Sequence, residues 1–531
     1  MAPSTRSSRR LRDDINAWRQ QRAERRQHPG ASNLASGSAP RVVILGAGMS
    51  GLCAAIQLRR SGISDITILE RSDGVGGTWR DNHYPGSACD VPSHLYSFSF
   101  ATNPSWSRKF ARQDEILRYF ERVADQFALL PLCRFGVEVV AATFDQSRSV
   151  WVLRCADGIE IEAEVFIAAT GQLSRPFIPP IDGLDTFEGT TFHSARWDHD
   201  HTLSGTRVGV IGNGASAVQF VPHVAAEAAS MTLFQRSANW ILPKPDREFS
   251  EREIWAFRHL PGVERAYRFS IYARLESRFT LMRDKSPLRR LVNRKILPEY
   301  RKLANDRLPE AACVPDYPIG CKRILISDDY YPALLKKTTR TVVDPIDHIV
   351  ADGIVTSTGE HFPLDTIIFG TGFQTTKFLT PISVTGLDGR DLHDEWAKGA
   401  SAHLGMAVPG FPNCFILYGP NTNLGHNSII FMTERQVEHI VRCVRELWRR
   451  GGHMEISPEV MTRSDMETQA RAQRTVWVAS CDSWYKNAEG RLTNNWPDRT
   501  TEYWRETVRS GPDDYDFAPG HVTSGQPART P

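Results

Sequence analysis

The sequence predicts an α/β fold: two Rossmann-like dinucleotide-binding domains with a helical insertion. Three observations support this. Two glycine-rich turns each lie between an apolar strand and a helix, and a segment at about 245–319 places apolar residues at helical spacing. The chain has 531 residues, enough for three or four domains with their own cores. Its composition is that of a globular protein, and its net charge of +3 argues against nucleic acid as a partner.

The cysteines and the N-terminal region indicate where the protein works. Nine cysteines are scattered and never spaced C-x-x-C, which fits a reduced cytoplasmic protein without a disulfide framework, a zinc site or a redox-active dithiol. No apolar run is long enough for a transmembrane segment. Residues 1–39 form a basic tail for which we expect flexibility and one short helix, with Leu11, Ile15 and Trp18 on one face. A transit peptide is the less favoured alternative.

The first glycine-rich turn follows the apolar run 42–45 and precedes a helix to about Arg60 and a strand at 65–70. Gly46, Gly48 and Gly51 form G-x-G-x-x-G in the context that the motif requires. Glycine permits the tight turn and the approach of a pyrophosphate to the helix N-terminus. Glu70, at the end of the second strand, can accept hydrogen bonds from ribose hydroxyls. We therefore interpret this turn as a binding site for FAD or NAD.

The second glycine-rich turn follows the strand 208–211 and has alanine, which the motif allows, as its third small residue. Arg236 stands 19 residues after Ala217, as Glu70 stands 19 after Gly51 (236 − 217 and 70 − 51). A guanidinium suits a 2′-phosphate, so we interpret this turn as an NADP site. The alternative is that Arg236 is a surface arginine that merely ends a strand. Two different dinucleotide sites imply hydride transfer from NADPH to a flavin.

Two longer motifs carry a family resemblance. Residues 76–90 match [A/G]-G-x-W-x(4)-[F/Y]-P-[G/M]-x(3)-D, and residues 187–198 read F-x-G-x-x-x-H-x-x-x-W-D. The residues of the second motif are Phe187, Gly189, His193, Trp197 and Asp198. Spacing alone assigns this string no function, and an ordinary linker with one hydrogen-bonded histidine is the alternative interpretation. Together the motifs resemble those of type I Baeyer–Villiger monooxygenases, and the resemblance extends over nearly the whole chain after residue 40.

The resemblance implies an activity. NADPH reduces FAD, O2 then gives a C4a-peroxyflavin, and one oxygen atom is inserted next to the carbonyl of a small-molecule ketone to give an ester or lactone. The segment 316–323 resembles the one that carries the family's active-site arginine, here Arg323, with Asp90 as its partner. An arginine stays protonated at any working pH, so it can stabilise both the peroxide anion and the oxyanion formed by its attack.

The motifs and the resemblance assign residues to each cofactor. FAD is expected at Gly46, Gly48, Gly51, Glu70, Gly77, Thr78, Trp79, Asp81, Asp90, Val91, Tyr96, Val139 and Ile429. NADP is expected at Gly212, Asn213, Gly214, Ala215, Ser216, Ala217, Gln219, Arg236, Ser237, Lys322, Arg323 and Trp484. Core packing is the alternative for Trp79 and Tyr84. His193 reads as a hinge or a core histidine, and not as a metal ligand, since no second ligand lies at metal-site spacing.

The predicted domains are discontinuous. An FAD domain takes 40–175 and 376–531, an NADP domain takes 176–244 and 320–375, and 245–319 is the helical insertion. In the insertion Tyr267, Ile271, Leu275 and Phe279 recur every four residues. We interpret this stripe as core and keep a membrane-surface helix as the alternative.

Other functions stay open on the same scaffold. Heteroatom oxygenation of nitrogen or sulfur is the main alternative, although related N- and S-oxygenases usually end the second motif with Tyr or Phe. A reductase, an NADPH oxidase or a catalytically silent redox sensor are further alternatives. One departure from the family is Ala88, where many members carry arginine. The sequence does not predict the oligomeric state.

Overall fold

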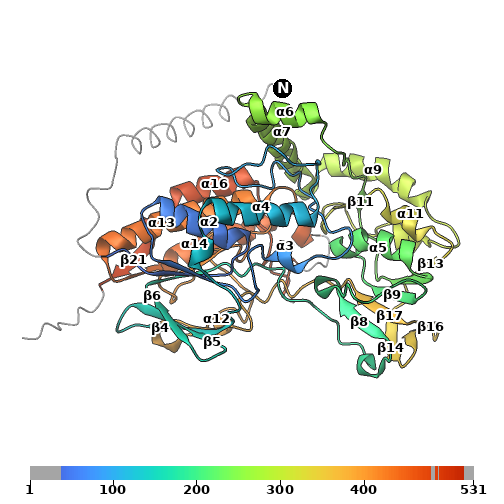
Figure 1. Cartoon of the computed structure of the whole chain (residues 1–531), viewed down its shortest axis with the longest axis horizontal. Coiled ribbons are helices and arrows are strands. Elements are labelled where there is room, and N and C mark those ends of the chain that lie inside the picture. The colour runs from blue at the N-terminus through green and yellow to red at the C-terminus, as the bar shows by residue number, and fades with distance from the viewer. Residues whose placement is uncertain (1–37, 480–484, 488, 520–531) are drawn as a thin grey trace, which may run out of the picture.

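The computed structural model describes residues 38–479, 485–487 and 489–519. Its first sheet has five parallel strands in the order β19-β7-β1-β2-β3 (Figure 1). These strands are β1 (Val42–Leu45), β2 (Ile66–Leu69), β3 (Cys133–Arg134), β7 (Val165–Ala168) and β19 (Cys414–Ile416). All residues of β1 and β7 are buried, as expected for strands covered on both faces.

The second sheet repeats this arrangement, with five parallel strands in the order β13-β10-β9-β17-β8. They are β8 (Thr190–His193), β9 (Arg207–Ile211), β10 (Ser230–Phe234), β13 (Thr339–Val342) and β17 (Thr366–Phe369). In strand order β9 corresponds to β1 and β10 to β2. The two glycine-rich turns therefore occupy equivalent places, which confirms the predicted fold class.

Helices cover the two sheets (Figure 1). The first has α2 (Met49–Arg60), α4 (Gln113–Gln126), α13 (Ile429–Arg450) and α16 (Thr500–Arg509), and the second has α5 (Ala215–Glu227) and α11 (Tyr330–Leu334). The inner face of α13 buries Ile430, Val437 and Val444 in one cluster with Leu52 and Ile56 of α2. Each sheet thus has its own core.

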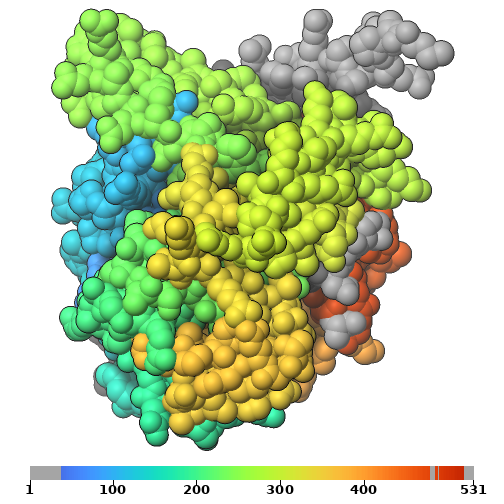
Figure 2. All heavy atoms as spheres, turned by 90° about the vertical axis from the view of Figure 1, so that its right-hand side faces the viewer, coloured from blue at the N-terminus to red at the C-terminus, as the bar shows by residue number. Residues whose placement is uncertain are grey.

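The segment between the halves of the second sheet is helical. It contains α6 (Glu251–His259), α7 (Val263–Ser277), α8 (Phe279–Met282), α9 (Pro287–Arg301) and α10 (Glu310–Cys313). Figure 2 shows these helices, green to yellow-green, gathered above the strands of the second sheet. Ile271, Leu275 and Phe279 are buried and Tyr267 is half-buried, so the interpretation of this stripe as core is confirmed.

Smaller elements complete the molecule. The smaller sheets contain β4 (Val139–Asp145), β5 (Val150–Cys155), β6 (Glu160–Ala163) and β18 (Ser383–Thr385); β14 (Ile346–Val350), β15 (Gly353–Thr356) and β16 (His361–Pro363); β11 (Ile241–Leu242) and β12 (Leu325–Ile326); and β20 (His453–Ile456) and β21 (Tyr515–Ala518). The remaining α-helices are α3 (Thr78–Asp81), α12 (Leu392–Glu395), α14 (Pro458–Ala472) and α15 (Val476–Ala479).

The structure can be compared with the sequence-based expectations about the cysteines and about membrane-spanning segments. The expectation that the cysteines are reduced is wrong at Cys321, which is disulfide-bonded; sequence spacing carries no signal for a pairing that only the fold creates. Seven other cysteines have free thiols. None of the described helices combines the length and apolarity needed to cross a bilayer. The predicted helix around Leu11 and the NADP residue Trp484 lie outside the described residues.

Candidate active site

The first glycine turn has no room for a side chain at its first and third glycines. Gly46 has φ +108°, and a Cβ added there would lie 2.7 Å from the carbonyl oxygen of Ala169. A Cβ on Gly51 would lie 1.9 Å from the carbonyl oxygen of Gly46, and one on Gly77 would lie 3.0 Å from Cα of Gly48. The predicted FAD motifs 46–51 and 76–79 therefore cross backbone against backbone. No side chain caps the N-terminus of α2 at Gly48, which fits a pyrophosphate there.

Glu70 is buried behind this turn. Its carboxylate accepts hydrogen bonds from the backbone N–H of Ala47 at 2.7 Å and of Ser72 at 2.9 Å. A carboxylate has about four acceptor positions, so these two bonds leave capacity for ribose hydroxyls. The placement fits the adenosine end of FAD.

Further predicted FAD residues lie around the same crossing. Trp79 donates from its indole Nε1 to the hydroxyl of Tyr96 at 3.0 Å, and burial raises the pKa of Tyr96, so this hydroxyl stays protonated. Burial also raises the pKa of Asp81, against the effect of Arg196 and Arg71. The others take these places: Thr78 begins α3, Val91 packs on the first core, Val139 begins β4, and Ile429 begins α13.

The second glycine turn has the same construction. Gly212 has φ +99°, and a Cβ there would lie 2.6 Å from the carbonyl oxygen of Gly370. Asn213 donates from its side-chain amide to Gln235 at 2.9 Å and to the carbonyl oxygen of Ser237 at 2.8 Å, which holds the turn against the end of β10. The residues that follow, Gly214, Ala215, Ser216 and Ala217, form the N-cap and first turn of α5.

Two cations stand where a 2′-phosphate is expected. Arg236 is exposed directly after Gln235. Lys322 donates from Nζ to the hydroxyl of Ser237 at 3.3 Å. The structure therefore brings Lys322 next to the 236–237 turn, although the two are far apart in the sequence. The residues present fit NADP at this end of the second sheet.

Gln219 connects the two halves of the molecule. Its side-chain oxygen accepts from the hydroxyl of Tyr84 at 2.9 Å and from the N–H of Ala88 at 3.3 Å, and its amide nitrogen donates to the carbonyl oxygen of Ala88 at 2.9 Å. A Cβ on Gly86 would lie 2.6 Å from the backbone oxygen of Gln219. The loop 84–90 is therefore fitted closely onto α5, and the Gln219 side chain serves this contact.

Asp90 and Arg323 form the charged centre of the site. The Nε of Arg323 donates to Oδ2 of Asp90 at 2.9 Å, and Nη2 of the same guanidinium contacts the same oxygen. Asp90 raises the pKa of Arg323, although burial acts in the opposite direction, so the guanidinium is charged at every working pH. Tyr418 and Tyr485 lie close enough to affect this charge.

The second motif forms an edge strand with a crossing beyond it. His193 ends β8, and its Nδ1 accepts from the N–H of Ala195 at 3.1 Å. Burial lowers the pKa of His193 to about 4, so its ring is neutral near pH 7. The ring packs edge-on against Phe373 at 5.7 Å between centroids, and Trp197 packs on Phe220 of α5 at 5.3 Å.

Three other motif residues have structural contacts. A Cβ on Gly189 would lie 2.4 Å from the carbonyl oxygen of Asp365 and 2.6 Å from the ring of Phe187. Asp198 accepts from the N–H of Asp200 at 3.0 Å and of His201 at 3.2 Å. The motif thus fixes the path of the chain from β8 toward α5.

Sequence reasoning missed a buried carboxylate at the end of the insertion. Glu276 of α7 accepts from Asn427 at 2.9 Å, from the hydroxyl of Thr500 at 2.8 Å and from the N–H of Thr501 at 3.1 Å, and His426 lies 3.5 Å away. Burial raises the pKa of Glu276, but the hydrogen bonds outweigh it and lower that pKa to about 2. No motif marks this residue, because its partners are at least 150 positions away.

Sequence reasoning also missed Arg278. Burial and the neighbouring Arg274 lower the pKa of its guanidinium, while Asp90 lies close enough to act in the opposite direction. It comes from the junction of α7 and α8. The insertion therefore brings a second cation toward the Asp90–Arg323 pair.

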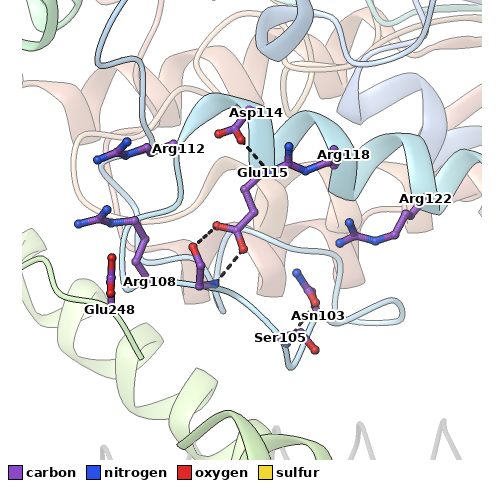
Figure 3. Close-up of a pocket in the computed structure, with 10 residues that line it drawn as sticks. Asn103, Ser105, Arg108, Arg112, Asp114, Glu115, Arg118, Arg122 and Glu248 are labelled. Atoms are coloured by element: carbon purple, nitrogen blue, oxygen red, sulfur yellow. Dashed lines mark hydrogen bonds and ion pairs between the residues drawn. The ribbon is translucent and has the colours of Figure 1, made fainter. Parts of the chain in front are cut away.

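A separate polar pocket of about 520 Å³ lies between α4 and the start of the insertion (Figure 3). Its lining is charged or hydrogen-bonding, and several side chains are paired with one another: Arg118 with Asp114 at 2.7 Å, and the hydroxyl of Ser107 with Glu115 at 2.7 Å. None of its lining residues belongs to the predicted site. We do not assign it to the reaction.

Comparison with known proteins decides the family. The chain is 42% identical over 487 residues to a Baeyer–Villiger monooxygenase of Pseudomonas aeruginosa, covering 91% of this chain and 92% of that protein. It is 43% identical over 472 residues to a Baeyer–Villiger monooxygenase of Streptomyces coelicolor, covering 88% and 91%. The chain belongs to the Baeyer–Villiger monooxygenases. This monooxygenase is also similar to the solved OTEMO complex with FAD and NADP, at 27% identity and a TM-score of 0.82, with 91% of this chain and 100% of that one covered.

A model of the pyridine nucleotide-disulphide oxidoreductase family matches residues 43–252, which include both glycine turns. The resemblance stated from the motifs is confirmed. The protein is thus an FAD-dependent NADPH monooxygenase that uses O2 to insert one oxygen atom next to a ketone carbonyl. The relatives give heteroatom oxygenation no better support than ketone oxygenation.

Proposed function

We propose that Arg323 is the catalytic cation of this Baeyer–Villiger monooxygenase and that Asp90 holds it in place. The observation that carries the proposal is their ion pair, which joins the FAD motif to the 316–323 segment across 233 positions. FAD, when bound, supplies oxygen activated from O2. The guanidinium of Arg323 stabilises negative charge on the substrate oxygen as the carbonyl carbon is attacked, and it does so without losing a proton.

The cofactors take the two equivalent turns. FAD binds at Gly46, Gly48, Gly51, Glu70, Gly77, Thr78, Trp79, Asp81, Asp90, Val91, Tyr96, Val139 and Ile429. NADPH binds at Gly212, Asn213, Gly214, Ala215, Ser216, Ala217, Gln219, Arg236, Ser237, Lys322, Arg323 and Trp484. Support comes from the backbone crossings that only glycine fits and from the two cations near the 236–237 turn. Arg323 lies next to Lys322, so one segment reaches both the nicotinamide cofactor and the catalytic centre.

We also propose a division into domains, which the strands of the two sheets support. The FAD domain takes 40–175 and 376–531, and the NADP domain takes 176–244 and 320–375. The first sheet draws its strands from 42–168 and 414–416, and the second from 190–234 and 339–369, within these bounds. His193, at the edge of the second sheet and packed on Phe373, lies where the chain crosses between domains and serves as a hinge.

The substrate is a small ketone, and the enzyme works in the cytoplasm. The seven free thiols among the described residues support a reducing compartment, although Cys321 is disulfide-bonded.

The variants Arg323→Ala and Arg323→Lys test the catalytic role. We expect Arg323→Ala to keep bound FAD and, at saturating NADPH, its reduction, but to lose ester formation by about 10²–10³-fold, with NADPH consumption diverted to hydrogen peroxide. Arg323→Lys should recover part of the yield, since it restores the charge without the two guanidinium nitrogens that contact Oδ2 of Asp90. Unchanged ester formation in Arg323→Ala would overturn the assignment.

A further inference from the structure

The outer face of α9 has an unusual composition. Pro287, Leu288, Leu291 and Pro298 are exposed on it, and Leu288 and Leu291 leave 45% and 51% of their surface uncovered. Exposed cations surround them: Arg290, Arg294, Lys295, Arg301 and Lys302. Glu299 is the acidic residue of this helix. Leucines are therefore exposed on a strongly basic helix face.

The cations and the apolar residues are arranged in stripes. At about 100° per residue, Pro287, Leu291 and Pro298 lie along the middle of the exposed face. Arg290, Arg294 and Arg301 follow one flank, and Lys295 and Lys302 follow the other, with Leu288 next to Lys295. Long basic side chains beside an apolar stripe can reach outward while their stems cover apolar surface.

The opposite face of α9 is occupied. Val292, Ile296 and Leu297 pack onto the cluster that contains Trp240 and Phe279. Ser286 caps the helix N-terminus by accepting from the N–H of Arg289 at 3.4 Å. The helix is thus fixed by its inner face, and the half-exposed leucines of the outer face belong to none of the core clusters of the described residues.

The charges of this face are only partly neutralised. Lys302 pairs with Glu299 at 2.8 Å and Arg301 with Glu310 at 3.4 Å. Within the part of the chain that the structure describes, Arg290, Arg294 and Lys295 form no ion pair. Figure 2 shows this yellow-green region on the open surface of the molecule.

We propose that the outer face of α9 docks onto an anionic lipid surface. Phosphate headgroups neutralise the two basic flanks, while Leu288 and Leu291 enter the boundary between headgroups and acyl chains. A second copy of the same face does not fit, because two sets of cations would repel each other. The reaction site is unaffected by docking, since α9 contributes no residue to it, and an apolar ketone dissolved in the bilayer would be delivered close to the enzyme.

Co-sedimentation of the FAD-loaded enzyme with vesicles tests this proposal. We expect binding to vesicles of equal parts phosphatidylcholine and phosphatidylglycerol, little binding to phosphatidylcholine alone, and weaker binding as salt is raised. The triple variant R290E/R294E/K295E should lose binding by about a hundredfold or more. L288S/L291S should lose about tenfold or more while its net charge is unchanged.

Two matched controls separate the face from general effects. R122E/K337E/K398E changes the net charge equally with cations elsewhere, and Met466→Ser removes another exposed apolar side chain, 68% uncovered, on α14. Both should bind vesicles nearly as the unaltered enzyme does. Equal binding to both lipid compositions, no binding at all, or equal losses in the controls and the α9 variants would each overturn the proposal. Turnover of a water-soluble ketone, measured without vesicles, should be the same in all four variants.

Discussion

The side-chain amide of Gln219 is hydrogen-bonded to both the N–H and the carbonyl oxygen of Ala88. Gln219 lies on the first helix of the predicted NADP domain, and Ala88 lies in the FAD motif. At this position many family members carry an arginine. Here the backbone, which any residue provides, makes the contact between the two halves, and Gln219 supplies both a donor and an acceptor for it.

Removing this side chain should loosen the two halves. We expect Gln219→Ala to raise the KM for NADPH about tenfold, because it removes hydrogen bonds worth about 1 kcal/mol each, and to leave FAD content unchanged. Gln219→Glu keeps the acceptor and loses the donor, so it should be intermediate. Steady-state kinetics with FAD quantified by absorbance provide the measurement. A KM equal to that of the unaltered enzyme would show that the contact does not set NADPH binding.

Arg236 should determine the choice of nicotinamide cofactor. Arg236→Gln removes a permanent charge from the expected 2′-phosphate position, so the KM for NADPH should rise about 10–100-fold, while the KM for NADH stays nearly constant. Lys337→Gln, an exposed cation of the same sheet region, is the control and should change neither value. Equal effects on both cofactors would mean that Arg236 acts on the fold and not on the phosphate.

His193 should not be the titrating group of the reaction near pH 7. Burial lowers its pKa from 6.5 to about 4, so the ring is neutral above about pH 5 in the folded enzyme. We expect His193→Gln to slow turnover but to keep the shape of the pH–rate profile above pH 5. The profiles of both enzymes, recorded with one ketone, make the comparison. Disappearance of a titration between pH 5 and 7 in the variant would contradict a neutral role.

The lowered pKa of His193 should also make the stability of the fold depend on pH. A histidine with a lowered pKa stabilises the fold fully above its unfolded pKa of 6.5, and this stabilisation is lost as the pH falls through about 4. The thermal midpoint of the unaltered enzyme should therefore fall between about pH 6.5 and pH 4. In His193→Gln it should fall less over the same pH range.

How much the sequence predicts depends on how local each feature is. The two glycine turns can be predicted from the sequence, because strand, turn and helix are adjacent in the chain. Nearby backbone atoms leave no room for a side chain at several of these glycines. The motif 187–198 does not by itself predict that Thr190–His193 forms the edge strand β8, because only pairing with β17, far along the chain, gives it that structure. The contacts of Gln219 with Ala88 and of Glu276 with Thr500 leave no pattern, since each joins single residues across domains.

Glu276 should stabilise the junction of the insertion with α13 and α16 in a pH-dependent way. Its pKa of about 2, below the ordinary 4.5, corresponds to about 3 kcal/mol of stability that is present above about pH 4.5 and lost as the pH falls toward 2. Glu276→Gln should lower the thermal midpoint by about 5 °C at neutral pH, and the difference should narrow on acidification. Glu264→Gln is the matched control on the same helix, because burial raises the pKa of Glu264 and it has no such stabilisation to lose. A constant difference between Glu276→Gln and the unaltered enzyme at every pH would show that the carboxylate's charge is not what holds this junction together.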